Sequence, residues 1–166
     1  MTIDRDFTSR EAAELAGINP ATFRSYFKSG HFRVIGSMSR KEAAKDGLAH
    51  IYGADDVMCF AVAKELIDRG AHPRTAFDIA AMKFAYSSDG KRNPGGLYDV
   101  NEHGYTMLAF DHVSGASQVF STGETESLFA ALANLNGGAG HATFLLLNKV
   151  DRDVQMRLRE MRGEFD

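Results

Sequence analysis

The apolar and polar positions near the start of the chain predict two consecutive helices. Thr8 and Glu11 form a T-x-x-E capping box, in which each side chain satisfies a free backbone N–H at a helix start. Gly17 can adopt the positive φ that ends a helix. Asn19 followed by Pro20 is a preferred N-cap before a preferred first helical residue, so the second helix begins there.

The second helix is predicted to have one packing side and one polar side. Phe23, Tyr26 and Phe27 share the packing side at i, i+3 and i+4 spacing. The other side presents hydrogen-bond donors and positive charge through Ala21, Arg24, Ser25 and Lys28. Two helices joined by a short segment with a glycine have the form of a helix-turn-helix, whose second helix can enter a DNA major groove. An ordinary helical hairpin is the alternative.

Two strands and two more helices are predicted next. Residues 31–35 and 48–52 read as short strands around a Gly- and Ser-containing segment, which suits a hairpin-like wing that holds Arg40, Lys41 and Lys45. Residues 53–70 have the pattern of a long helix, with acidic residues in the first turn and a glycine at the end. Residues 72–86 predict a further helix.

The pattern changes after Tyr86. Residues 87–96 contain three glycines and a proline and cannot extend a helix, so they are interpreted as a domain linker between residues 1–86 and residues 97–166. The second unit is predicted to have the order β-β-α-β-α and to end in a helix with an apolar stripe of Val154, Leu158 and Met161. The predicted fold class is therefore α+β.

The distribution of charge adds to this picture. The net charge of the 166 residues is −3, yet the segment from Pro20 to Lys45 holds six basic residues and one acidic residue, a local charge of +5. The six basic residues are Arg24, Lys28, Arg33, Arg40, Lys41 and Lys45. Such a stripe suggests a surface that binds a polyanion, with a simple solvated face as the alternative.

Other classes of function have little support in the sequence. It has no long apolar run and no secretion-type N-terminus, so we expect no membrane contact and a cytoplasmic location. Cys59 lies in an apolar helical run and is expected to be a buried, inert thiol. His103, Asp111, His112 and His141 lack metal-ligand spacing, and nucleophile or phosphate-loop motifs are missing. We therefore expect no catalytic activity, no metal site and no cofactor.

The N-terminal half resembles the DNA-binding domain of the MerR family of bacterial transcription regulators. The stretch FTSREAAELAGINPATFRSYFKSGHF is similar to that family's aromatic-Thr start, first helix, turn and recognition helix, and IYGADDVMCFAVAKELIDRGAHPRTAFDIA resembles its following helices. By position, Thr22, Arg24 and Tyr26 match the family's Thr, Arg and second Tyr, which in similar proteins lie at or near the DNA. Ala21 stands where the family often has Arg or Lys, and Ser25 replaces the first Tyr.

The resemblance implies an N-terminal winged helix-turn-helix and a sequence-specific transcription regulator that binds double-stranded DNA, with RNA polymerase as a further partner. The implied and predicted DNA-binding residues are Ala21, Thr22, Arg24, Ser25, Tyr26, Lys28, Arg33, Arg40, Lys41 and Lys45. The alternatives are an excisionase-like architectural protein that bends DNA and a winged-helix module that binds proteins.

A homodimer on an inverted repeat is expected, because a two-fold dimer adds the binding energy of both half-sites. The family's usual dimer helix is interrupted here after Tyr86, so residues 97–166 are expected to hold the dimer together. The candidate surfaces are the apolar strand at 142–148 and the stripe on the last helix. The alternative is that both only complete the core of one chain.

Overall fold

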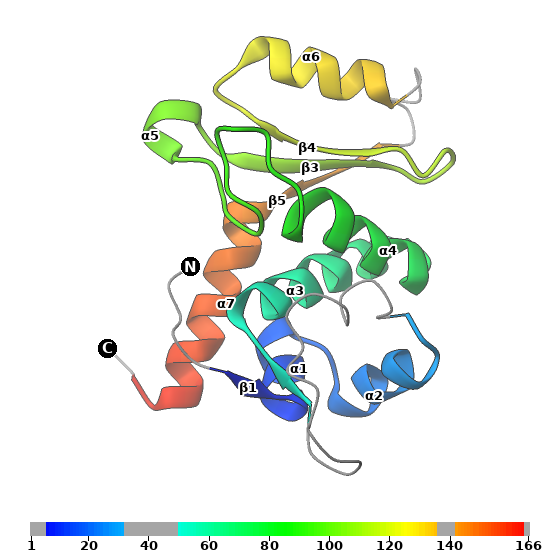
Figure 1. Ribbon diagram of the computed structural model, residues 1–166, viewed down its shortest axis with the longest axis vertical. Helices are drawn as coiled ribbons and strands as arrows, with labels where there is room; N and C mark the ends of the chain where they lie inside the picture. Colours follow the sequence, from blue (N-terminus) through cyan, green and yellow to red (C-terminus); the bar gives the residue numbers. More distant parts are fainter. Residues whose placement is uncertain (1–5, 32–49, 136–141, 165–166) are drawn as a thin grey trace.

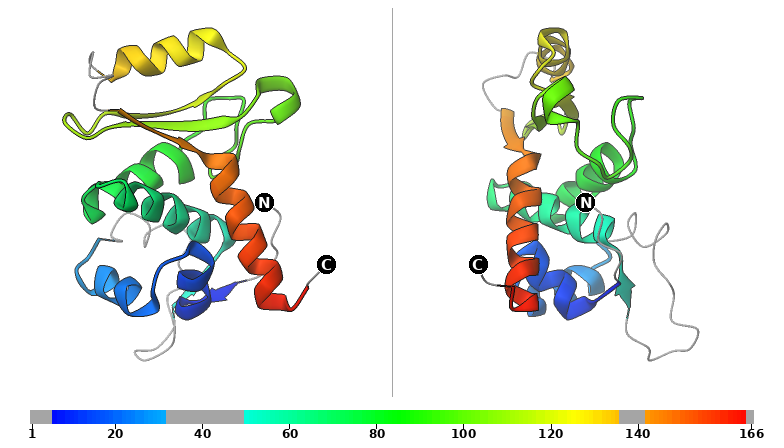
Figure 2. Two further views of the ribbon diagram at one scale, coloured as in Figure 1. Left: turned by 180° about the vertical axis from the view of Figure 1, so that it is seen from behind. Right: turned by 90° about the vertical axis from the view of Figure 1, so that its left-hand side faces the viewer.

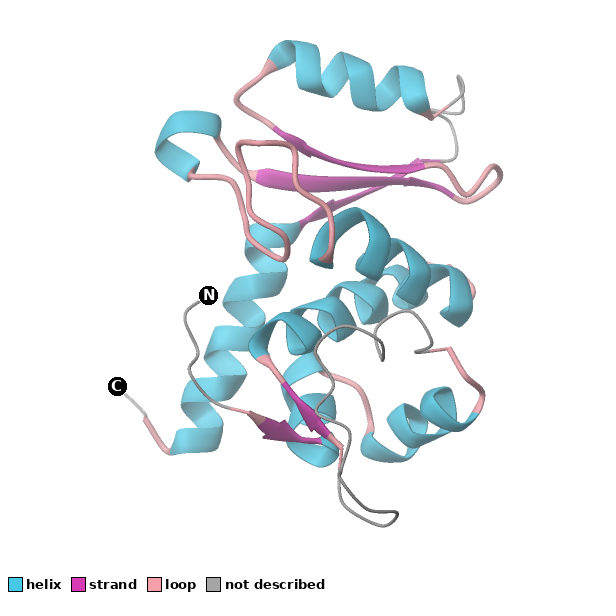
Figure 3. Ribbon diagram, in the orientation of Figure 1, coloured by secondary structure: helices cyan, strands magenta, loops and turns pink. Residues whose placement is uncertain are grey.

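The computed structural model describes residues 6–31, 50–135 and 142–164 and shows a mixed α+β fold with two small antiparallel sheets (Figure 1). This confirms the predicted fold class. Most of the described chain is helical (Figure 3). The elements in chain order are β1 (Phe7–Thr8), α1 (Ser9–Ala16), α2 (Pro20–Lys28), β2 (Ile51–Tyr52), α3 (Ala54–Asp68), α4 (Pro73–Ile79), the π-helical segment η2 (Ala80–Ala85), α5 (Val100–His103), β3 (Thr106–Asp111), β4 (Ser117–Ser121), α6 (Thr125–Asn134), β5 (Ala142–Leu146) and α7 (Leu147–Arg162).

The predicted caps of the first two helices are all present. The Thr8 hydroxyl accepts from the Glu11 N–H at 3.3 Å, and the Glu11 carboxylate accepts from the Thr8 N–H at 2.9 Å. Gly17 ends α1 with a φ of 73°. The Asn19 side chain accepts from the N–H of Ala21 at 2.9 Å and caps α2. The turn between the helices is therefore fixed at both ends by local hydrogen bonds.

Helix α3 is the centre of the helical part. It is apolar around most of its circumference, because α1, α4, η2 and α7 all pack against it. Cys59 is fully buried here, as predicted, and burial raises the pKa of its thiol well above the usual value. The predicted helix over 72–86 is present as α4 continued by η2, and the π-helical form of its second half was not predicted.

A three-stranded sheet of order β4-β3-β5 lies between α6 on one face and the helical part on the other (Figures 1 and 2). Leu108 pairs with Leu145 in the register, and both side chains belong to the core shared with the helices. On the opposite face, Ala109 and Phe120 pack with Ala131 of α6 and with Leu135, the residue that caps this helix. The predicted order of strands and helices after residue 97 is thus confirmed, with the short helix α5 in front of it as an addition.

The last helix joins the two parts of the chain. α7 follows directly after β5 and runs beside α1 and α3 (Figure 2). Val154 is fully buried and Leu158 is 3% exposed, both in the core that contains the N-terminal helices, and Met161 packs against that core. The sequence left two roles open for this stripe, a dimer surface or completion of the core of one chain. In the structure these side chains complete the core.

The segment at 87–96 has no helix or strand, as its glycines and proline predict. It nevertheless packs back onto the helical part, because Arg92 is 5% exposed and hydrogen-bonds to the end of η2. Among the described helices, none has both the length and the apolar character needed to cross a membrane.

Candidate nucleic-acid interface

An aromatic cluster fixes the orientation of α2. Phe23 is 1% exposed, and its ring meets the ring of Tyr52 at 5.8 Å and that of Phe60 at 5.0 Å, both edge to face. These contacts join α2 to β2 and to α3. Such aromatic pairs add about 0.5–1.5 kcal/mol each beyond the area that they bury. The helix is therefore held by the side that the sequence predicts to pack.

The two other aromatic residues of this side are half-buried. The Tyr26 ring lies edge to face against Phe77 of α4 at 5.6 Å, and Phe27 lies against His50 at 4.7 Å. Tyr26, which the family resemblance places near DNA, is thus also a packing contact between α2 and α4.

The opposite side of α2 is open to solvent. Its exposed residues are Ala21, Thr22, Arg24, Ser25 and Lys28. A hollow of about 420 Å³ is lined by four of them, namely Ala21, Arg24, Ser25 and Lys28. The structure therefore brings together on one surface the residues that the spacing along α2 predicts to share a side.

The positive charges on this surface are not neutralised by the described part of the chain. Within residues 6–31, 50–135 and 142–164, neither the Arg24 side chain nor the Lys28 side chain has a hydrogen bond or an ion pair. No acidic residue lies on α2. Both side chains can therefore extend toward an external anion without breaking an internal contact.

Arg24 also borders a second hollow, which the sequence did not predict. This hollow has a volume of about 360 Å³ and is lined by Ser9, Arg10, Pro20 and Arg24, so the starts of α1 and α2 meet there. Arg10 Nε donates to Glu14 Oε1 at 2.8 Å, a contact that raises the pKa of Arg10. Arg10 adds a third cation to the surface, although one partly offset by Glu14.

No protein-family model matches this chain, and no curated protein matches it either. Function is therefore inferred from the geometry and charge of the site itself.

The remaining predicted DNA-binding residues are Arg33, Arg40, Lys41 and Lys45, and all four lie outside the described residues. The predicted strand at 31–35 falls almost entirely in the same segment. Its predicted partner strand is present at Ile51–Tyr52, where it pairs with Phe7–Thr8.

Three of the four residues considered for a metal site are described, and each has its own separate contacts. His103 lies 3.4 Å from a Glu124 carboxylate oxygen, whereas the ring of His112 contacts the Thr143 hydroxyl at 2.6 Å. Asp111 accepts hydrogen bonds within its own β-turn. His141 lies outside the described residues. Among those described, no group of three or more His, Cys, Asp or Glu could hold a metal ion.

Proposed function

We propose that this protein is a sequence-specific DNA-binding transcription regulator that acts as a homodimer on an inverted-repeat site. The observation that carries the proposal is the two-sided character of α2. One side is packed against the core through Phe23. The other exposes Arg24 and Lys28, two cations without an ion pair among the described residues, beside short polar side chains. A rigid helix with this outer surface suits insertion into a major groove.

In this proposal α1 and α2 are the two helices of a winged helix-turn-helix. Arg24, near the centre of the exposed surface, reaches base edges, where an arginine can bind the O6 and N7 acceptors of guanine. Lys28 and Arg10, toward the sides, contact phosphates and set the position of the helix on the duplex. Arg33, Arg40, Lys41 and Lys45 extend the contact to the flanking backbone through the wing.

The homodimer is proposed to form through residues 97–166. Eight of the ten exposed large hydrophobic residues among those described belong to this part: Val100, Tyr105, Val113, Leu128, Phe129, Phe144, Leu146 and Met156. Val154 and Leu158 are excluded as contacts because they are buried within one chain. β5 remains a candidate surface, because Leu146 is 38% exposed and Phe144 is 39% exposed.

The test is a selection of DNA fragments from a random pool by the purified full-length protein, followed by sequencing. We expect one motif with two-fold symmetry to be enriched. Arg24→Ala should enrich a motif with a relaxed preference at one base position of each half-site, whereas Arg152→Ala, which removes an exposed arginine from α7, should enrich the wild-type motif.

Two results would point to other functions. Absence of DNA binding even at low salt would favour a protein-interaction module. Cooperative binding in arrays with strong bending of the DNA, measured by energy transfer between the ends of the duplex, would favour an architectural protein.

A further inference from the structure

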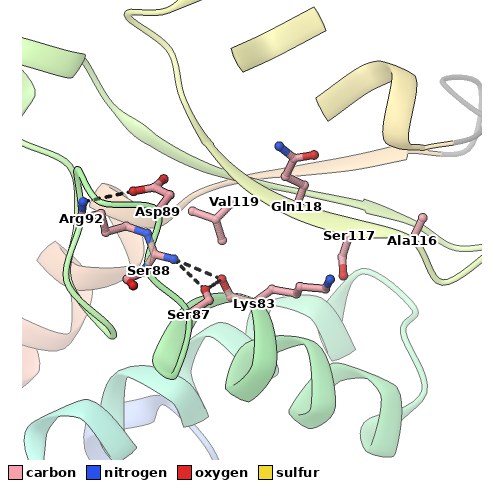
Figure 4. Close-up of a pocket in the computed structure, with 9 residues that line it drawn as sticks. All are labelled: Lys83, Ser87, Ser88, Asp89, Arg92, Ala116, Ser117, Gln118 and Val119. Atoms are coloured by element: carbon pink, nitrogen blue, oxygen red, sulfur yellow. Dashed lines mark hydrogen bonds between the residues drawn. The ribbon is translucent and has the colours of Figure 1, made fainter. Parts of the chain in front are cut away.

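A separate cavity of about 470 Å³ lies between the helical part and the sheet, away from α2 (Figure 4). Its walls come from the end of η2, from the loop that follows and from β4. The lining residues are Lys83, Ser87, Ser88, Asp89, Arg92, Ala116, Ser117, Gln118 and Val119. The volume falls within the range of about 300–1,000 Å³ that small-molecule sites occupy.

Arg92 forms the inner wall and has one unused donor. Its Nη1 donates to the Phe84 carbonyl at 3.0 Å, and its Nη2 donates to the Ser87 hydroxyl at 2.8 Å and to the Lys83 carbonyl at 3.3 Å. The guanidinium also lies over the Phe84 ring at 5.7 Å. Its Nε is buried and, among the described residues, has no acceptor. The buried guanidinium therefore adds positive charge behind this wall rather than a donor that a ligand can reach.

Lys83 supplies a positive charge on the side of the cavity opposite Arg92. Figure 4 shows its side chain extended along the cavity toward Ser117. Within the described part of the chain, its ammonium group has no ion pair or hydrogen bond. This ammonium group is therefore available to a ligand.

Asp89 does not cancel both cations. Its Oδ1 accepts from the backbone N–H groups of Lys91 and Arg92, each at 3.1 Å, and its Oδ2 accepts from the Tyr98 hydroxyl. The loop thus holds the carboxylate in place. Its single negative charge offsets one of the two positive charges of Lys83 and Arg92, so these three lining residues give the cavity a net charge of +1.

We propose that this cavity binds a small molecule through a phosphate group. Nη1 and Nη2 of Arg92 already donate to backbone carbonyls and to a hydroxyl group, so they cannot bind a planar carboxylate in a bidentate manner. What remains is a point charge from Lys83 and the hydroxyl groups of Ser88 and Ser117, beside the buried positive charge of Arg92. Separate donors around a cavity suit the several oxygens of a tetrahedral phosphate.

The proposal is independent of DNA binding, and inorganic phosphate is the probe for it. Calorimetric titration of the full-length protein in a phosphate-free buffer should give a measurable dissociation constant, and phosphate should raise the melting temperature. Acetate at equal ionic strength should do neither. Lys83→Ala, at an exposed position, should weaken phosphate binding by about tenfold or more.

Lys149→Ala is the matched control, because Lys149 is an exposed lysine on α7. It should bind phosphate as the wild type does. Three results would overturn the proposal: no phosphate binding by the wild type, equal binding by wild type and Lys83→Ala, or an equal effect of acetate.

Discussion

Arg157 of α7 donates a hydrogen bond from Nη1 to the backbone carbonyl of Leu15, at 3.1 Å. The acceptor lies in the last turn of α1, where carbonyl groups have no partner within the helix. The guanidinium rests against Gly17, where an added Cβ would lie 3.1 Å from Arg157 Cζ. The C-terminal helix therefore supports the turn that sets α2 in place.

This contact predicts that Gly17 and Arg157 are coupled. Gly17→Ala should lower the free energy of unfolding by more than about 1 kcal/mol, because the positive φ disfavours any Cβ and the methyl group also crowds the guanidinium. In an Arg157→Ala background only the backbone cost should remain. Urea denaturation of the two single variants and the double variant measures the coupling. Strict additivity of the two changes would contradict the contact.

The buried stripe of α7 predicts a change in stability rather than in assembly. Leu158→Ala should lower the free energy of unfolding by about 2–5 kcal/mol, as for other large-to-small core changes. Met156→Ala, at a residue that is 54% exposed on the same helix, should have an effect within about 0.5 kcal/mol. Denaturation and light scattering together test this. A stable Leu158→Ala protein with an altered oligomeric state would show that the residue serves an interface.

The sequence predicts those features that depend on neighbouring residues. The capping box of Thr8 and Glu11 and the Asn19-Pro20 pair define where α1 and α2 begin, because a cap satisfies N–H groups within one turn. The polar side of α2 is equally local, since residues three and four apart share a side of a helix.

Contacts between distant segments could not be predicted in this way. The apolar stripe with Val154 and Leu158 shows that α7 must pack, but periodicity does not name its partners, α1 and α3. The glycines and proline of residues 87–96 correctly exclude a helix, yet they do not reveal that Arg92 turns back to cap η2. Arg10 was missed at the site because it meets Arg24 only across two helices.

The proposed roles of Arg24 and Lys28 predict different responses to salt. Arg24→Ala should weaken binding to the selected DNA by about 1–3 kcal/mol and relax the preference at one base position. Lys28→Ala should weaken binding to all sequences alike and reduce the slope of log affinity against log salt by about 0.9. Fluorescence anisotropy over a range of salt concentrations measures both effects. Wild-type affinity in Arg24→Ala would remove this residue from the interface.

The loop after η2 predicts a dependence of stability on pH. Burial alone would raise the pKa of Asp89, but hydrogen bonds from Tyr98 and from the N–H groups of Lys91 and Arg92 outweigh it and lower the pKa. A lowered pKa in the folded state gives stability above the unfolded pKa that is lost as pH falls through the folded value. Wild type should therefore lose its advantage over Asp89→Asn below about pH 4. Urea midpoints of both proteins at acid and neutral pH test this, and a difference that persists in acid would contradict it.

The last prediction concerns the homodimer. Full-length protein should be dimeric at micromolar concentration by light scattering, and Phe129→Lys should weaken the dimer, because Phe129 of α6 is an aromatic residue that remains 66% exposed in one chain. A lysine there would have to be desolvated in an apolar interface, whereas it costs little on a solvated surface. Met82→Lys is the matched control, because Met82 is 57% exposed and lies in η2, outside residues 97–166. It should leave the dimer intact. The monomeric variant should keep its fold and bind a half-site, but it should lose the added energy of the inverted repeat. A wild-type protein that is monomeric both in solution and on the repeat would rule out the dimer, and dimers of unchanged strength in Phe129→Lys would exclude α6 from the interface.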